Sequence, residues 1–154
     1  MKTLLRLLRL EFIPASADLG LLLLRLWLGL SLLLLHGWNK LSNFQSMSGK
    51  FADPLGIGTQ ASLSLAVFGE VVGSLLLVLG LFARFAALSC ASVMVVAFCF
   101  THRMALKGSN SGELAFIYLA GFITLLIAGP GRFAVDKASS GSKREKSAPR
   151  PARD

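Results

Sequence analysis

Cysteine and histidine are scarce in this chain, and their scarcity argues against two kinds of chemistry. Only Cys90 and Cys99 occur, nine residues apart in one apolar stretch. Nine residues turn a helix through about 900°, so these thiols lie on opposite faces and cannot pair with each other. A membrane thiol oxidoreductase needs neighbouring cysteines. The histidines, His36 and His102, belong to no HxxxH or ExxH pair, and no metal site is predicted.

Charged residues are also few, and their absence from long stretches indicates the fold class. They make up 16% of the 154 residues, against 54% hydrophobic residues, and the mean hydropathy is +0.66. A helix needs about 20 apolar residues to cross a bilayer and must close its own backbone hydrogen bonds there. The sequence therefore predicts an all-α polytopic membrane protein, an antiparallel bundle of four transmembrane helices at about 19–35, 61–82, 86–100 and 114–128. The alternative is a soluble all-α protein with very apolar helices.

Acidic residues number eight against sixteen basic ones, a net charge of +8. In a four-span chain, eleven of the basic residues fall on the side that holds both termini: Lys2, Arg6, Arg9, Arg84, Arg132, Lys137, Lys143, Arg144, Lys146, Arg150 and Arg153. Four fall on the opposite side: Lys40, Lys50, Arg103 and Lys107. This asymmetry predicts a membrane protein with both termini in the cytoplasm. Because orientation accounts for the basic excess, the lipid bilayer and not nucleic acid is the expected partner.

The two ends of the chain differ from the apolar middle. Residues 1–17 are expected to form an amphipathic cytoplasmic segment. Its helix covers about residues 1–13 and ends at Pro14, since Lys2, Arg6 and Arg9 recur at helical spacing among leucines. Asp18 is expected to cap the first span. Residues 137–154 are polar and basic, which predicts a disordered cytoplasmic tail. The domain between these ends is expected to cover residues 18–136.

Two charged residues lie inside the predicted spans. Glu70 is near the middle of the second span, where a charge costs about 2.5–3.5 kcal/mol. Arg25 lies in the first span. Counted in residues from the cytoplasmic ends of the two spans, Arg25 and Glu70 are about 9 Å apart along the bundle axis. Three interpretations remain open: an Arg25–Glu70 ion pair, a Glu70 that binds a ligand or proton, and a neutral, packed Glu70.

A polar site is also predicted towards the outer end of the bundle. His36 and Lys40 share a helix face at i, i+4. His102 ends the third span and Glu113 opens the fourth, so with Glu70 these residues are candidates to line an outward-opening pocket. The alternatives are that Lys40 extends to the interface and that Glu113 stabilises a helix N-terminus.

Two further features concern packing and cofactors. Gly69 and Gly73 form a GxxxG pattern that permits close helix approach. Trp27 and Trp38 either bracket the membrane or pack inside it. A quinone stacked on one of these tryptophans is the one cofactor left open, and no cofactor is assigned.

Three ordered segments carry a resemblance to a known family: RLWLGLSLLLLHGWNKL, FGEVVGSLLLVLGLFAR and GELAFIYLAGFITLLIAGPGRFAVD. They contain Arg25, His36-Gly37, Lys40, Gly69-Glu70, Gly80, Arg84, Gly129-Pro130-Gly131-Arg132 and Asp136. Over about residues 19–136 the chain resembles the DoxX family of small bacterial four-span membrane proteins.

The resemblance implies a four-helix bundle in the bacterial cytoplasmic (inner) membrane and an association with redox chemistry. The family is named after a subunit associated with thiosulfate:quinone oxidoreduction, and relatives are linked to membrane redox complexes and thiol stress. Three hypotheses follow. The first is an accessory, non-catalytic subunit that has membrane or cytoplasmic redox partners. The second is a small quinone- or sulfur-compound oxidoreductase acting through Glu70 and His36. The third is a permease-like module, which would require a homo-oligomer.

Overall fold

The computed structural model describes residues 2–137, and the regular structure within that range is entirely helical. Three continuous helices are long and apolar enough to cross a membrane: Ala17–Ser42, Thr59–Leu79 and Ala83–Thr101. A fourth apolar helix, α8 (Glu113–Ala128), has 16 residues. Its length is about 24 Å, less than the roughly 30 Å of bilayer hydrocarbon. The all-α prediction is confirmed, together with three helices capable of spanning a membrane.

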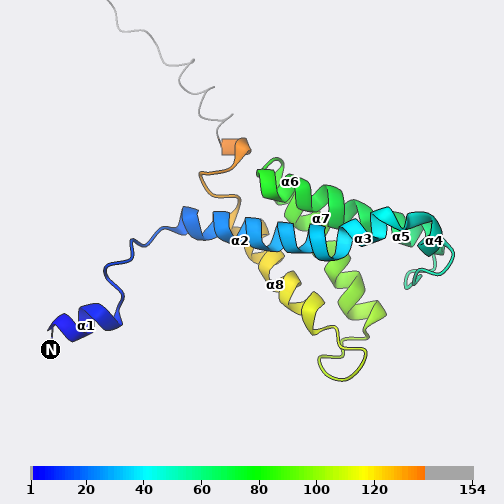
Figure 1. Ribbon diagram of the computed structural model, residues 1–154, viewed down its shortest axis with the longest axis horizontal. Helices are drawn as coiled ribbons and strands as arrows, with labels where there is room; N and C mark the ends of the chain where they lie inside the picture. The colour runs from blue at the N-terminus through cyan, green and yellow to red at the C-terminus, as the bar shows by residue number, and fades with distance from the viewer. Residues whose placement is uncertain (1, 138–154) are drawn as a thin grey trace, which may run out of the picture.

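Each of the three long helices contains one π-helical segment. The elements in order are α2 (Ala17–Leu32), η1 (Leu33–Gly37) and α3 (Trp38–Ser42), then α5 (Thr59–Val67), η2 (Phe68–Gly73) and α6 (Ser74–Leu79), then α7 (Ala83–Val95) and η3 (Val96–Thr101). Figure 1 shows the α2–α3 rod running alongside α5–α6, while α8 slants away from the rod. A wider π-helical turn is uncommon and often lies at a functional site.

Close approach of the first two long helices depends on glycines. A Cβ atom at Gly37 would lie 2.8 Å from the carbonyl oxygen of Glu70, and one at Gly29 would lie 3.2 Å from that of Ser74. These contacts align Gly37 with Glu70. They also define which residues of α2 and α3 can reach the second helix.

The second and third helices are equally close. Gly69 faces Val93 and Ser89 of α7, and Gly73 faces Cys90. The Cys90 thiol is buried and lies 3.3 Å from the Gly69 carbonyl oxygen, to which it donates. Gly69 and Gly73 thus lie on the face of the second helix that packs against the third.

The ends of the elements differ from the sequence-based expectations. Helix α1 (Lys2–Leu8) stops well before Pro14, because Leu10 adopts a left-handed φ of 50°. The first long helix continues to Ser42, and α4 (Phe44–Ser48) follows, so the predicted outer loop is shorter than 39–60. The cap of α2 is Ser16, not Asp18. The predicted tail from residue 138 onward lies outside the described residues.

Asp53 organises the remaining part of that loop. Its carboxylate accepts hydrogen bonds from the amides of Ile57 and Gly58 and from the Ser62 hydroxyl, at 2.7–3.0 Å. The Ser62 hydrogen bond and the amide of Gly58 lower the pKa of Asp53 below its ordinary value. The loop is therefore tied to the first turn of α5 by one ionised side chain.

The Gly37 contact predicts that Gly37→Ala is destabilising. The added methyl group meets backbone atoms of Glu70, which cannot rotate away, so the two helices must separate at a cost of about 1–3 kcal/mol. Thermal unfolding in mild detergent measures the loss. Gly20→Ala is the matched control, because a Cβ at Gly20 meets nothing within 4 Å; equal melting temperatures for both variants would contradict the packing.

The Asp53 contacts predict a pH-dependent contribution to stability. Since folding lowers this pKa, the contribution is present above the ordinary pKa of 3.8 and is lost as the pH falls through the lower, folded-state value. Asp53→Asn should therefore lower the melting temperature at neutral pH, and the difference from the parent protein should shrink on acidification. A difference that stays constant from pH 7 to pH 3 would contradict this role.

Candidate functional site

The charged side chains of the first two long helices meet in one ion pair. The Lys40 ammonium lies 2.6 Å from Oε2 of Glu70. The Glu70 side chain is 6% exposed and that of Lys40 is 19% exposed. Close contact of η1 with η2 at Gly37 allows the Lys40 chain to extend back to the carboxylate. The pair therefore places a full positive and a full negative charge in contact inside the protein.

A short row of polar groups continues from this pair towards α8. His36 lies near enough to interact electrostatically with both Lys40 and Glu70. Its ring packs edge-on against Tyr118, with centroids 6.1 Å apart and planes at 88°. The Tyr118 hydroxyl donates to the Ser31 hydroxyl at 2.8 Å. Tyr118 is the single tyrosine of the chain. Its position inside an apolar helix is the sequence signal for this row, which the candidate residues chosen from the sequence did not include.

These contacts bring part of the predicted outer site together. His36, Lys40 and Glu70 gather where η1, α3 and η2 adjoin. The other two predicted members lie elsewhere. The His102 ring contacts Asn110 at 3.1 Å, and Glu113 is exposed in the first turn of α8.

Arg25 occupies a separate buried position. Its Nη1 and Nη2 atoms donate to the carbonyl oxygens of Pro130 and Phe133, at 3.1 and 3.3 Å. The residue is 1% exposed. Its guanidinium group also contacts Gly80, where no side chain blocks it. Asp136 adds an electrostatic attraction. Arg25 therefore anchors the segment after α8 to the first helix.

Of the three interpretations left open for Glu70, the Arg25–Glu70 ion pair is therefore wrong, and helix register explains why. Glu70 lies level with Gly37, whereas Arg25 lies level with Gly80. Ten residues separate Glu70 from Gly80, which corresponds to about 15 Å along a helix. The sequence-based estimate of about 9 Å between Arg25 and Glu70 assumed that the first and second apolar segments have their cytoplasmic ends at the same level. In the structure, α2 begins well before the level at which α6 ends. Lys40, on the other side of Gly37, is the residue within reach.

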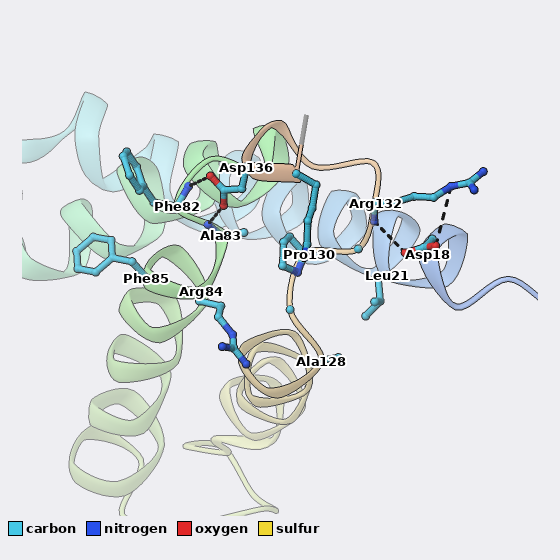
Figure 2. A pocket seen from close by; sticks show the side chains of 13 residues that line it. Asp18, Leu21, Phe82, Ala83, Arg84, Phe85, Ala128, Pro130, Arg132 and Asp136 are labelled. Atoms are coloured by element: carbon cyan, nitrogen blue, oxygen red, sulfur yellow. Dashed lines mark hydrogen bonds and ion pairs between the residues drawn. The ribbon is translucent and has the colours of Figure 1, made fainter. Parts of the chain in front are cut away.

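The end of the bundle near Arg25 holds a second polar cluster, shown in Figure 2. Asp136 accepts hydrogen bonds from the amides of Phe82 and Ala83, both at 2.9 Å, and thereby caps the start of α7. Arg84 donates to the carbonyl oxygens of Leu126 and Ile127 at the end of α8. Asp136 and Arg84 both occur in the segments that resemble the family, and neither contact could be read from the sequence.

The Lys40–Glu70 contact predicts that substitutions of these two residues change the free energy of unfolding non-additively. Removing one member of a buried pair costs about 3–5 kcal/mol, because the other charge is left without a partner. Lys40→Met should cost more than Glu70→Gln, since Glu70 is the more buried and a long lysine chain can extend towards the interface.

The double variant Lys40→Met/Glu70→Gln should recover much of that loss in detergent unfolding experiments. Lys50→Met, at an exposed loop position, is the control and should leave stability unchanged. Strictly additive losses in the double variant would contradict a direct ion pair.

Comparisons with known proteins identify the family. The chain aligns at 39% identity over 112 residues with an uncharacterized protein from Haemophilus influenzae, which covers 67% of this chain and 78% of the relative. No solved structure matches the chain. The family model named DoxX matches residues 20–103, a range that contains Arg25, His36, Lys40 and Glu70. The chain thus belongs to the DoxX family, and its apolar helices make it a membrane protein.

Proposed function

We propose that this DoxX protein is an accessory subunit that binds a membrane redox or oxidative-stress assembly through its first long helix. The supporting observation is a row of exposed apolar side chains along α2, η1 and α3. The row, here called the Trp ridge, comprises Leu23, Trp27, Leu30, Leu34, Trp38 and Leu41. Its members recur at three- or four-residue spacing, which aligns them along one helix face.

The tryptophans make this ridge more than an ordinary lipid-facing surface. Trp27 is 79% exposed and Trp38 is 59% exposed. Eleven residues separate them, or about 16 Å along the helix, whereas the two membrane interfaces are about 30 Å apart. Tryptophan prefers those interfaces, and this spacing keeps the pair from occupying both. Exposed tryptophans are also frequent energetic centres of protein–protein contacts. A transmembrane helix of a partner subunit would cover them.

The internal charges agree with an accessory role. Lys40 and Glu70 neutralise each other, and Arg25 is engaged by backbone carbonyls. These arrangements hold helices and the segment after α8 together. The catalytic alternative assigns proton transfer to Glu70 and His36, and the proximity of His36 to the ion pair is the observation in its favour.

The proposed arrangement in the cell is an inner-membrane bundle of four spans with both termini in the cytoplasm. The eleven-to-four distribution of basic residues supports this orientation. Helix α8 supplies the fourth span, and its exposed apolar side chains support contact with lipid: Leu114, Phe116, Ile117, Ile123 and Ile127. A tilted short helix can be accommodated by local thinning of the bilayer.

Co-purification tests the accessory role. The full chain, isolated from its own membranes in mild detergent, should carry a stoichiometric membrane or cytoplasmic redox protein, identified by mass spectrometry and by its cofactor absorbance. Trp27→Leu/Trp38→Leu should reduce the recovered partner about tenfold or more, since tryptophan contacts often dominate such interfaces. The variant should keep the parent melting temperature because the ridge is exposed.

Phe100→Leu is the matched control for this experiment. Phe100 is an aromatic residue of η3 that is 52% exposed, so the change removes a similar group from a different face. It should leave recovery of the partner unchanged. A protein that is recovered alone, or equal loss in both variants, would contradict the proposal. Turnover by the isolated chain that His36→Ala abolishes would favour the catalytic alternative.

A further inference from the structure

A cavity of about 930 Å³ opens at the end of the bundle where α2 begins and α8 ends. Residues from the start of α2, the α6–α7 turn, and the segment after α8 line it. Figure 2 shows this region with Arg84 reaching towards α8 and Arg132 beside Asp18. Cavities of about 300–1,000 Å³ are large enough to enclose small organic ligands.

Positive charge exceeds negative charge around this cavity. Arg84, Arg132 and Lys137 line it together with Asp18 and Asp136. Three formal positive charges against two negative ones leave an excess of one. The acids are already engaged by the main chain: Asp136 accepts from two amides of the α7 start, and Asp18 accepts from the Arg132 amide at 2.8 Å.

The basic side chains that line the cavity have fewer charged partners than the two acidic ones. Within residues 2–137, neither Arg84 nor Lys137 forms an ion pair with a carboxylate. Arg84 is held by its Nε and Nη2 atoms on the carbonyls of Leu126 and Ile127, so its guanidinium group has a defined position. The Arg132 side chain is 73% exposed, and its Nε lies 3.9 Å from Asp18. Donors therefore remain for an anion.

The rest of the wall is apolar and continues onto the outer surface of the helices. Phe82 and Phe85 line the cavity and are 65% and 55% exposed, and Leu21 of α2 contributes from the opposite side. A ligand that fits this combination has an anionic head and an apolar body. A free inorganic anion would use the cations alone and would leave the aromatic wall uncovered.

We propose that this cavity binds the phosphate group of an anionic phospholipid, with the acyl chains against the apolar wall. Basic pockets between transmembrane helices at the membrane surface are suited to such headgroups. Binding would link the α6–α7 turn to the segment after α8, which Arg25 and Asp136 already hold. This site is independent of the Trp ridge and of the accessory role.

Native mass spectrometry of the full chain in mild detergent tests the site. Phosphatidylglycerol should bind about tenfold more tightly than phosphatidylcholine with the same acyl chains, because only the former carries a net charge. Arg132→Gln/Lys137→Gln should abolish that preference. Both side chains are exposed, and among the described residues neither donates a hydrogen bond to a helix carbonyl, so the variant should keep its melting temperature.

Arg103→Gln/Lys107→Gln is the matched control. It makes the same change in net charge in the loop at the other end of α7 and α8, and it should retain the preference. Three results would overturn the proposal: equal affinity for the two lipids, equal loss in both double variants, or displacement of phosphatidylglycerol by an equal concentration of inorganic phosphate. The last result would assign the site to a free anion.

Discussion

A charge inside a bilayer requires a partner at contact distance, and this requirement organises the core of the present DoxX protein. Glu70 lies in the middle of the second apolar helix and is almost completely buried. The Lys40 ammonium at 2.6 Å supplies its partner. Lys40 can reach Glu70 only if the end of the first helix passes close to η2. This close approach is possible because Gly37 has no side chain. The ion pair and the glycine contact therefore depend on each other.

The opposite end of the bundle applies the same principle with different partners. Two nitrogen atoms of Arg25, Nη1 and Nη2, donate to the main-chain carbonyls of Pro130 and Phe133, which brings the segment after α8 across the first helix. Asp136 then caps α7. The buried Arg25 and the partly buried Lys40 thus have different structural consequences. Lys40 joins two long helices, whereas Arg25 joins a helix to an irregular segment whose glycines and proline leave carbonyls available.

Much of this architecture could be predicted from residue patterns, because apolar runs and buried charges have few physical solutions. The helical class, the three long apolar helices and the importance of Glu70 follow from hydropathy and from the cost of charge in lipid. The one partner that the sequence suggested for Glu70, Arg25, is wrong. Which residues of the two helices lie at the same level depends on where Gly29 and Gly37 allow the helices to approach. The ends of the apolar segments in the sequence do not give those positions. Likewise, the position of His102 depends on the bend of the 101–112 loop, which no periodicity specifies.

The Lys40–Glu70 contact can be measured directly in a bilayer. Solid-state NMR on protein labelled with ¹⁵N-lysine and ¹³C-glutamate reports the dipolar coupling between a lysine Nζ and a glutamate Cδ. The 2.6 Å separation of Nζ and Oε2 should give one strong coupling. This coupling should disappear in Lys40→Met and persist in Lys50→Met. A Glu70 carboxylate without coupling to Lys40 would contradict the ion pair on which this description of the core rests.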